Sequence, residues 1–415
     1  MARTAHALIA GAGIGGVAAA IALARAGLRV TVLERVPLIE EVGAGLQLSP
    51  NATRVLERFG VLGRIQDVAT EPEALRIRRG RDGATLVRMP LGPLARLRWG
   101  APHLVIHRAD LLRALLEQAA AHPDITIETG VEVAGFASSA DGVEVGARRG
   151  DTHLRFEADL FIGADGLRSV VRDKLGLGQA DQPLWSGRTA WRALVPAEAA
   201  PEHALRLETN LWLGTKAHLV HYPLRHGSLV NLVAITEDGW RGDPPEEFWS
   251  TPGKRSEVVA RFARWDREAR DLVQAATVWQ RWPLFDRNPP ARWSAGRVTL
   301  LGDAAHPMVP FLAQGAGQAI EDAAELEAVF AGASDIGAAL SDYEKRRLPR
   351  AAAVQLASRR QATIYHLAGP AAFARDLVLR NIGFRRMMAQ MDWLYAHGGP
   401  TKTPSAPAEP LAAEL

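Results

Sequence analysis

The chain has 415 residues, of which 47% are hydrophobic and 23% charged, with a formal net charge of +3. This length exceeds one compact core and is short for three full domains, so we expect two. The small net charge gives no reason to expect a nucleic-acid partner. Because the chain has no cysteine, disulfides, thiolate metal sites and redox-active cysteine pairs are excluded, and we assign no metal.

Arginine clusters such as 346-RRLPR-350 lack interleaved aromatic residues, and we interpret them as solvated faces. The sequence runs directly into its first predicted strand, and no uninterrupted apolar run reaches ~18 residues. We therefore expect no membrane span and, by default, a cytoplasmic location.

The first 34 residues follow the order of a dinucleotide-binding unit. A strand at Ala7–Ala10 leads into the turn 11-GAGIGG-16, an alanine-rich helix follows to Arg25, and a second strand at Arg29–Leu33 is followed by Glu34. This order predicts a parallel, Rossmann-like sheet.

Glycine is needed at three positions of this turn for physical reasons. Gly11 permits the tight turn, Gly13 lets the backbone approach a pyrophosphate, and Gly16 lets the helix pack close to the sheet. The helix N-terminus offers N–H groups and a partial positive charge, and Glu34 can accept hydrogen bonds from ribose hydroxyls. The alternative is a turn that only joins a strand to a helix.

Further elements are expected along the chain. In order they are an extended segment at 103–107, a helix from Asp110 to His122, a β-meander over 125–160, a buried strand in 159-DLFIGADG-166, alternating strands and a helix over 185–285, a buried strand in 297-RVTLLGDAAH-306, and helices over 319–395.

Three motifs occur in order: 11-GAGIGG-16, 163-GADGLRSVVR-172 and 302-GDAAHPMVPFLAQGAGQAIEDA-323. With them the chain resembles the class A, single-component FAD-dependent aromatic hydroxylases, within the group of salicylate hydroxylase, 3-hydroxybenzoate 6-hydroxylase and 6-hydroxynicotinate 3-monooxygenase. The resemblance extends from residue 6 to about residue 325.

The resemblance implies an α/β fold. A Rossmann-like FAD-binding domain, glutathione-reductase-like and of the para-hydroxybenzoate-hydroxylase type, is interleaved with a β-sheet substrate domain and C-terminal helices. We assign residues 1–70, 100–180 and 286–365 to the FAD-binding domain, 71–99 and 181–285 to the substrate domain, 366–399 to a C-terminal helical segment and 400–415 to a disordered tail.

The resemblance also implies FAD as cofactor. Glu34 matches the residue on the adenosine ribose, Arg108 the arginine near the flavin phosphate or ribityl chain, and Asp303 the aspartate on a ribityl oxygen. The full expected set is Gly11, Gly13, Ile14, Gly15, Gly16, Glu34, Arg35, Gln47, Arg108, Asp165, Arg168, Gly302, Asp303, Gly315, Ala316 and Gly317.

Some of these residues have simpler alternatives. Asp165 and Asp303 can be turn formers after buried strands, and Arg108 a surface residue at a helix start. Asp165 and Arg168 lie in a motif associated with both FAD and the nicotinamide donor. Because only one dinucleotide fingerprint is visible, we expect FAD to stay bound and NADH or NADPH to bind transiently, without a choice between the two donors.

We predict that the segment 216-KAHLVHYPLR-225 carries the side chains that contact the substrate. If this segment is a strand, His218 and Tyr222 share one face and His221 lies on the other. The resemblance favours the same pair, His218 as base or hydrogen-bond partner of a phenol and Tyr222 as a carboxylate or hydroxyl contact; the alternative is two satisfied sheet residues. Pro310 matches the stretch beside the flavin ring. His306 is a less favoured candidate for the site, and its alternative is a side chain that only buttresses that loop.

The function that follows is hydroxylation of a small hydroxylated aromatic acid by FAD, NAD(P)H and O2 through a flavin C4a-hydroperoxide. Salicylate to catechol is the first expectation, and 3-hydroxybenzoate or 6-hydroxynicotinate the second. A non-catalytic flavin-binding sensor and a homodimer stay open. The arginine for the substrate carboxylate is unassigned among Arg188, Arg192 and Arg225.

Overall fold

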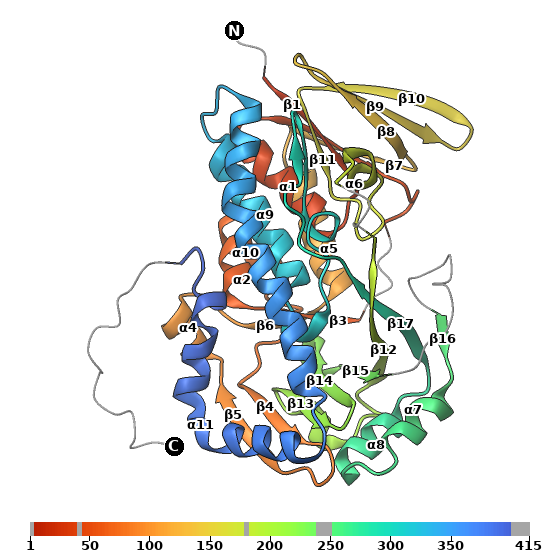
Figure 1. Ribbon diagram of the computed structural model, residues 1–415, viewed down its shortest axis with the longest axis vertical. Helices are drawn as coiled ribbons and strands as arrows, with labels where there is room; N and C mark the ends of the chain where they lie inside the picture. Colours follow the sequence, from red (N-terminus) through yellow and green to blue (C-terminus); the bar gives the residue numbers. More distant parts are fainter. Residues whose placement is uncertain (1–3, 40–43, 178–181, 238–250, 400–415) are drawn as a thin grey trace.

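The computed structural model describes residues 4–39, 44–177, 182–237 and 251–399. Figure 1 shows a parallel sheet with helices in the upper part of the view and a larger, mostly antiparallel sheet in the lower part. The helix α10 (Ile336–Tyr365) runs from the first part to the second, and α11 (Gly369–Tyr395) packs against the lower sheet. The predicted tail, 400–415, lies outside the described residues.

Within the described ranges, the upper sheet has six strands in the order β18-β19-β11-β1-β2-β7, parallel from β19 to β7. Every residue of β1 (His6–Ala10) is buried, as expected for a strand covered on both faces. Small alanine side chains in α1 (Ile14–Arg25) let it pack closely against α9 (Gly315–Phe330). The other strands are β2 (Arg29–Glu34), β7 (Ile125–Thr129), β11 (Leu160–Gly163), β18 (Ser294–Ala295) and β19 (Val298–Leu300).

The lower sheet, counted over the same described residues, has eight strands in the order β16-β17-β12-β15-β14-β13-β4-β5. In β14 (Ala217–Leu224), His218 pairs with Ile235 and Tyr222 with Asn231 of β15 (Leu229–Glu237). Side chains alternate along a strand, so His218 and Tyr222 share a face. The remaining strands are β4 (Ala74–Arg79), β5 (Thr85–Pro90), β12 (Leu184–Pro196), β13 (Glu208–Gly214), β16 (Thr251–Gly253) and β17 (Trp279–Asp286).

Smaller elements complete the fold. The strands β3 (Gly45–Leu48) and β6 (Leu104–His107) form an antiparallel pair, and β8 (Glu132–Ser138), β9 (Val143–Arg149) and β10 (Thr152–Ala158) form a meander. The other helices are α2 (Pro50–Arg58), α3 (Leu62–Ile65), α4 (Pro93–Trp99), α5 (Arg108–Ala120), α6 (Val170–Leu175), α7 (Arg255–Phe262) and α8 (Arg267–Ala275), with 3-10 turns at Glu202–Leu205, Arg225–Gly227, Gly302–Ala304 and Pro310–Leu312.

Two local predictions were wrong in detail. The predicted meander over 125–160 begins only at β8, because β7 pairs in parallel with β2 and belongs to the upper sheet. The helix predicted from Asp110 begins at Arg108, because the side chain of His107 caps it by accepting a hydrogen bond from the N–H of Ala109.

Candidate functional site

The turn between β1 and α1 depends on glycine at two points of close approach. Gly11 has φ +100°, and a Cβ there would lie 2.6 Å from the carbonyl oxygen of Ala164. A Cβ on Gly16 would lie 1.9 Å from the carbonyl oxygen of Gly11, which no side chain can accommodate. A Cβ on Gly13 would meet no atom within 4 Å. The turn is therefore closed on the protein side and open where a phosphate would approach.

Glu34, at the end of β2, holds this turn in place. One carboxylate oxygen accepts a hydrogen bond from the N–H of Ala12 at 2.7 Å, and the other accepts one from Val36 at 3.0 Å. Each carboxylate oxygen has a further lone pair for a ribose hydroxyl. Arg35 is exposed beside it.

A cavity of about 320 Å³ joins the turn to the lower sheet. One end is formed by the glycine turn and the loop after β19, and the other by β12, β14 and β15. Of the residues predicted for cofactor or substrate, those in its wall are Gly13, Ile14, Gly15, Gln47, Arg108, His218, Tyr222, Gly302, Asp303, Pro310, Gly315 and Ala316.

The loop after β19 contributes many residues to the cavity wall. Gly302 has φ +62°, and Ala313 has the same left-handed sign at φ +52°. Between them the chain bends through Pro310 and reaches α9, whose first residues Gly315 and Ala316 lie in the cavity wall. No side chain caps this end of α9, so its N–H groups are available for negative charge.

Arg108 and Asp303 bring opposite charges to the same wall. Arg108 begins α5, and its backbone N–H donates to the carbonyl of Ala44. Desolvation by the surrounding protein raises the pKa of Asp303, and the nearby His306 and Arg108 counter this only in part. The carboxyl oxygens of Asp303 can accept hydrogen bonds from hydroxyl groups.

Asp165 and Arg168 do not line the cavity. The carboxylate of Asp165 accepts hydrogen bonds from the hydroxyl of Ser169 at 2.5 Å and the N–H of Val171 at 3.2 Å, so it stabilises the start of α6. Desolvation raises its pKa despite these bonds. Arg168 is exposed. Their direct part in cofactor binding stays a prediction, as it does for Gly11, Gly16, Glu34, Arg35 and Gly317, which also lie outside the wall.

His218 and Tyr222 lie in the cavity wall on the face of β14 that the alternation predicts, while His221 points away and accepts a hydrogen bond from Trp212 Nε1. Desolvation, followed by the charges of His366 and Arg188, lowers the pKa of His218 well below its usual value. Desolvation raises the pKa of Tyr222. Both side chains are therefore neutral near pH 7.

The structure separates the three candidate arginines. Arg225 donates two hydrogen bonds to the buried Asp110, and Arg188 pairs with Glu237 at 3.1 Å. Arg192 lines the cavity, and its Nε is buried with no hydrogen-bond partner among the described residues. Of the three arginines, Arg192 is therefore the one that lines the cavity.

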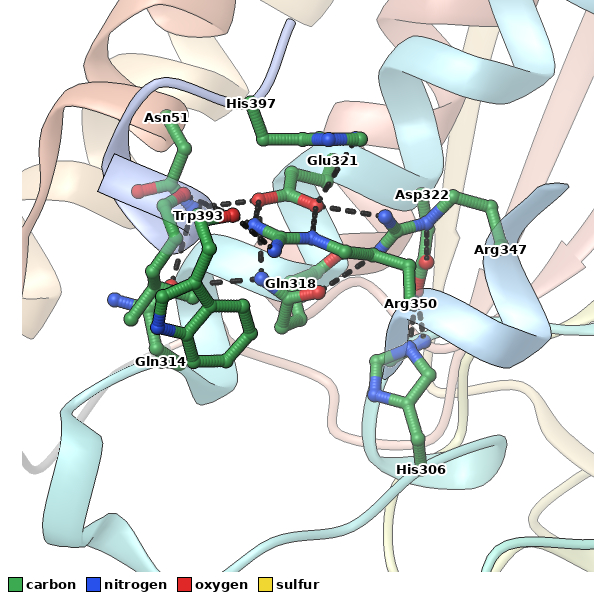
Figure 2. Close-up of polar contacts among 12 residues, drawn as sticks. Asn51, His306, Gln314, Gln318, Glu321, Asp322, Arg347, Arg350, Trp393 and His397 are labelled. Atoms are coloured by element: carbon green, nitrogen blue, oxygen red, sulfur yellow. Dashed lines mark hydrogen bonds and ion pairs between the residues drawn. The ribbon is translucent and has the colours of Figure 1, made fainter. Parts of the chain in front are cut away.

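A buried charge cluster lies behind the loop (Figure 2). One carboxylate oxygen of Asp322, on α9, accepts a hydrogen bond from the N–H of Gly302 at 2.9 Å and lies 2.6 Å from His306 Nε2. The other oxygen accepts a hydrogen bond from Arg347 Nε at 2.7 Å. His306 is buried and lies outside the cavity wall, so it buttresses the loop. Arg347 comes from α10 and also donates to Glu321 at 2.7 Å.

The same cluster reaches the other side of the loop. Glu321 accepts hydrogen bonds from Asn51 Nδ2 at 2.6 Å and Arg350 Nη2 at 3.0 Å, and Asn51 also donates to Gln314 at 3.1 Å. Arg350 continues to the end of α11, where it donates to the carbonyl of Trp393 (Figure 2).

This cluster corrects the interpretation of 346-RRLPR-350 as a solvated face. Arg347 is buried and Arg350 nearly so, because Glu321 and Asp322 need counter-charges once α9 packs inside the molecule. The signal was present in the third motif, where two adjacent acids, Glu321 and Asp322, follow the small and apolar residues Ala319 and Ile320.

Comparison with known proteins agrees with this geometry. Residues 4–358 match the family model described as FAD binding domain. The chain is 40% identical to 3-amino-4-hydroxybenzoate 2-monooxygenase PtnB3 of Streptomyces platensis, covering 93% of this chain and 94% of that one. It is 37% identical to 3-hydroxybenzoate 6-hydroxylase of Polaromonas naphthalenivorans (strain CJ2), covering 94% and 95%.

A solved structure described as a salicylate hydroxylase substrate complex superimposes with a TM-score of 0.79 at 27% identity, over 94% of this chain and 95% of that one. The fold, the glycine turn after β1 and the named relatives together show that the protein is a flavin-dependent aromatic monooxygenase with FAD as cofactor. The chain belongs to the FAD-binding-domain family of aromatic hydroxylases, and the predicted fold class is confirmed.

The open side of the glycine turn, the unpartnered start of α9 and Asp303 in the wall fit FAD. Across the described part of the chain, no helix is both long enough and apolar enough to cross a lipid bilayer.

The two turn glycines form a matched pair of substitutions. Gly16→Ala forces a methyl group into the carbonyl of Gly11, so we expect the free energy of unfolding to fall by about 1–3 kcal/mol or more. Gly13→Ala meets no protein atom, so we expect a stability change within about 0.5 kcal/mol but weaker FAD binding. Urea unfolding of the FAD-free protein and flavin fluorescence titration measure the two effects; equal destabilisation would contradict the assignment.

For the charge cluster, we expect Arg347→Met to cost about 3–5 kcal/mol of stability, because two buried carboxylates lose their partner. Arg346→Met is the control, since Arg346 pairs with Glu325 near the surface and should cost at most about 1 kcal/mol. Urea denaturation at pH 7 measures both, and similar costs would argue against a buried cluster.

The same cluster predicts acid sensitivity. Burial by itself would raise the pKa values of Glu321 and Asp322, but Arg347, with His306 for Asp322 and Arg350 for Glu321, lowers both to about 2. The carboxyls titrate at about 4 when unfolded, so their stabilisation is complete above about pH 5 and is lost as the pH falls from there towards 2. Urea unfolding across this pH range measures the effect. The free energy of unfolding should fall less steeply with decreasing pH in Asp322→Asn than in the wild type.

Proposed function

We propose that this enzyme hydroxylates a hydroxybenzoate, with 3-hydroxybenzoate as the first candidate, using O2 and NADH or NADPH. The observation that carries the proposal is the single cavity with the glycine turn at one end and Arg192, His218 and Tyr222 at the other. The names of the relatives support it, because two of them act on benzoates that carry a ring hydroxyl.

Arg192 is the proposed partner of the substrate carboxylate. Its guanidinium lies 5.0 Å from the ring of Trp282, and its buried Nε has no hydrogen-bond partner in the described structure. A buried donor without a partner costs free energy, and a carboxylate would satisfy it through charge-assisted hydrogen bonds. Tyr222, in the same wall, can add a hydroxyl contact.

Part of the cavity wall is apolar. Val220, Val233, Ile235 and Met308 contribute to its wall. These side chains can hold an aromatic ring and keep water away from the reacting carbon. Their arrangement suits a small ring with a polar group at each end.

His218 is the proposed partner of the ring hydroxyl. A neutral imidazole can accept the phenol proton, and the resulting phenolate makes the ring more electron-rich. A free phenol has a pKa near 10, so forming the phenolate at pH 7 costs about 4 kcal/mol without such help. Bound FAD, reduced by the nicotinamide donor and reoxidised by O2, supplies the oxygen-transfer chemistry.

Salicylate is the second candidate. Pro310 lies in the cavity wall, and proline at this position resembles salicylate hydroxylases; the substrate-bound salicylate hydroxylase also has a similar fold. 6-Hydroxynicotinate remains a further candidate of the same size.

We also propose the division of labour between the domains. Residues 1–70, 100–180 and 286–365 would hold FAD, while 71–99 and 181–285 would cover the substrate. In support, β4 and β5 pair into the sheet that contains β14, although they precede it by more than a hundred residues in the chain.

The first experiment is anaerobic stopped-flow reduction of the bound flavin by NADH and by NADPH. We would compare salicylate, 3-hydroxybenzoate, 4-hydroxybenzoate, 6-hydroxynicotinate and 3-amino-4-hydroxybenzoate. We expect the true substrate to speed reduction by at least about tenfold, or more than about 1.4 kcal/mol of barrier, and to give a hydroxylated product with O2. A protein that binds these acids without faster reduction would instead be a sensor.

Arg192→Met tests the carboxylate contact. We expect the dissociation constant of the preferred acid to rise by about 10- to 100-fold, because a charged hydrogen bond contributes about 1.5–3 kcal/mol. Phenol, which lacks the carboxylate, is the control ligand, and its affinity should not fall. Flavin spectral titration measures both, and an equal loss for phenol would show general damage to the cavity.

A further inference from the structure

A row of three titratable side chains leads from the cavity to the surface. His218 Nδ1 lies 2.8 Å from His366 Nε2, and His366 Nδ1 lies 3.1 Å from Glu237 Oε1. His218 lines the cavity and His366 is buried, whereas the Glu237 side chain is 30% exposed. The row is assembled from β14, the end of α10 and the end of β15.

The spacing fixes how the protons can be arranged. If both rings are neutral, His218 Nδ1–H donates to His366 Nε2, and His366 Nδ1–H donates to the carboxylate of Glu237. In the other tautomer His366 Nδ1 would accept a hydrogen bond from Arg188 Nε, at the longer distance of 3.4 Å. Because the contact with Glu237 is shorter, we assign the Nδ1 proton to the bond with Glu237. His218 Nε2 then carries a lone pair and has no partner among the described residues.

The surroundings disfavour a resting positive charge in this row. The rings of Phe311 and Tyr365 lie 5.2 and 5.3 Å from the ring of His218. Arg188 donates to Glu237 at 3.1 Å, and its charge opposes an imidazolium on either histidine. Desolvation, followed by Arg188, lowers the pKa of His366 to about 4, even though Glu237 favours the charged ring and Arg261 adds to the opposition.

His218 is poorly placed to keep a proton that it takes from a phenol. A proton that stopped on His218 would make an imidazolium in an apolar, positively charged setting. A proton that moved on to Glu237 would reach a partly exposed carboxylate and then water. The geometry provides that second route.

We propose that His366 and Glu237 form, with His218, a relay that carries the proton of the bound phenol from the cavity to solvent. The proposal rests on the proposed function, in which the substrate presents a phenol to His218. His366 and Glu237 touch no substrate, so they are positioning residues that act through His218.

The steps balance without any change of oxidation state. The phenol O–H bond breaks as a bond from His218 Nε2 to hydrogen forms. The Nδ1 proton of His218 passes to His366 Nε2, and the Nδ1 proton of His366 passes to Glu237, which releases it to water. When a proton moves inward to the product oxygen, the same transfers run in reverse and restore the row.

Proton release on binding, without turnover, tests the relay. The FAD-loaded enzyme is mixed anaerobically, with no nicotinamide donor, with 3-hydroxybenzoate in weakly buffered solution that contains a pH-indicator dye. The dye follows proton release, and flavin absorbance follows binding. We expect Glu237→Gln and His366→Gln to slow proton release by at least about tenfold while they leave the dissociation constant and FAD content close to wild type.

Two comparisons separate a relay from a structural role. Glu237→Asp keeps the carboxylate and should recover much of the rate, and imidazole added to His366→Ala should restore part of it. His203→Gln is the control, because His203 contacts the backbone of Glu268 and not the row. If His366→Gln fails to fold, the Glu237→Gln and Glu237→Asp pair, at a partly exposed site, decides the question.

The outcomes distinguish the two proposals. Proton release at the wild-type rate in both Gln variants, with normal binding, overturns the relay and leaves the proposed function intact. If neither 3-hydroxybenzoate nor salicylate binds to the wild-type enzyme, the proposed function fails and the relay fails with it. Slow release in the Gln variants and recovery in Glu237→Asp supports both.

Discussion

The pairing of Arg347 with Glu321 and Asp322 is the constraint on which the site depends. Two carboxylates on one buried helix are costly unless a fixed cation neutralises them, and Arg347 reaches both from α10. Once paired, Asp322 holds the N–H of Gly302, and Glu321 reaches Gln314 through Asn51. Both ends of the loop that lines the cavity are therefore fixed by the same ion cluster.

This rigidity gives the cavity a fixed wall between two sheets of different character. The upper, parallel sheet ends in the glycine turn, where backbone N–H groups bind negative charge. The lower sheet offers the alternating side chains of β14 and β15, which bring His218, Val220 and Tyr222 to one face. The upper sheet therefore contributes mainly backbone groups to the cavity, and the lower sheet contributes side chains.

Much of this arrangement was predictable from short-range patterns. The glycine turn is specified by spacing and local sterics, and the shared face of His218 and Tyr222 follows from the strand period of two. The choice among three arginines was not predictable, because it depends on which partners each one meets. Asp110 engages Arg225 from 115 residues away, which no local pattern records.

The charge cluster and the row behind His218 were missed for the same reason. His366 is 148 residues from His218 and 129 from Glu237, so their proximity is a product of tertiary packing. The segment 346–350 carried a misleading signal, since arginines usually lie in solvent. The two adjacent acids of the third motif, Glu321 and Asp322, were the hint that a cation must be buried there.

The helix α10 links the two halves of the site, because it carries Arg347 and is followed directly by His366. Each residue added to a helix rotates everything beyond it by about 100°. An insertion between these two positions would therefore turn the support of the flavin loop and the histidine behind the substrate out of register with each other. For engineering, side chains on β12, β14 and β15 can be exchanged with those of related hydroxylases. The number of residues between Arg347 and His366 must be kept.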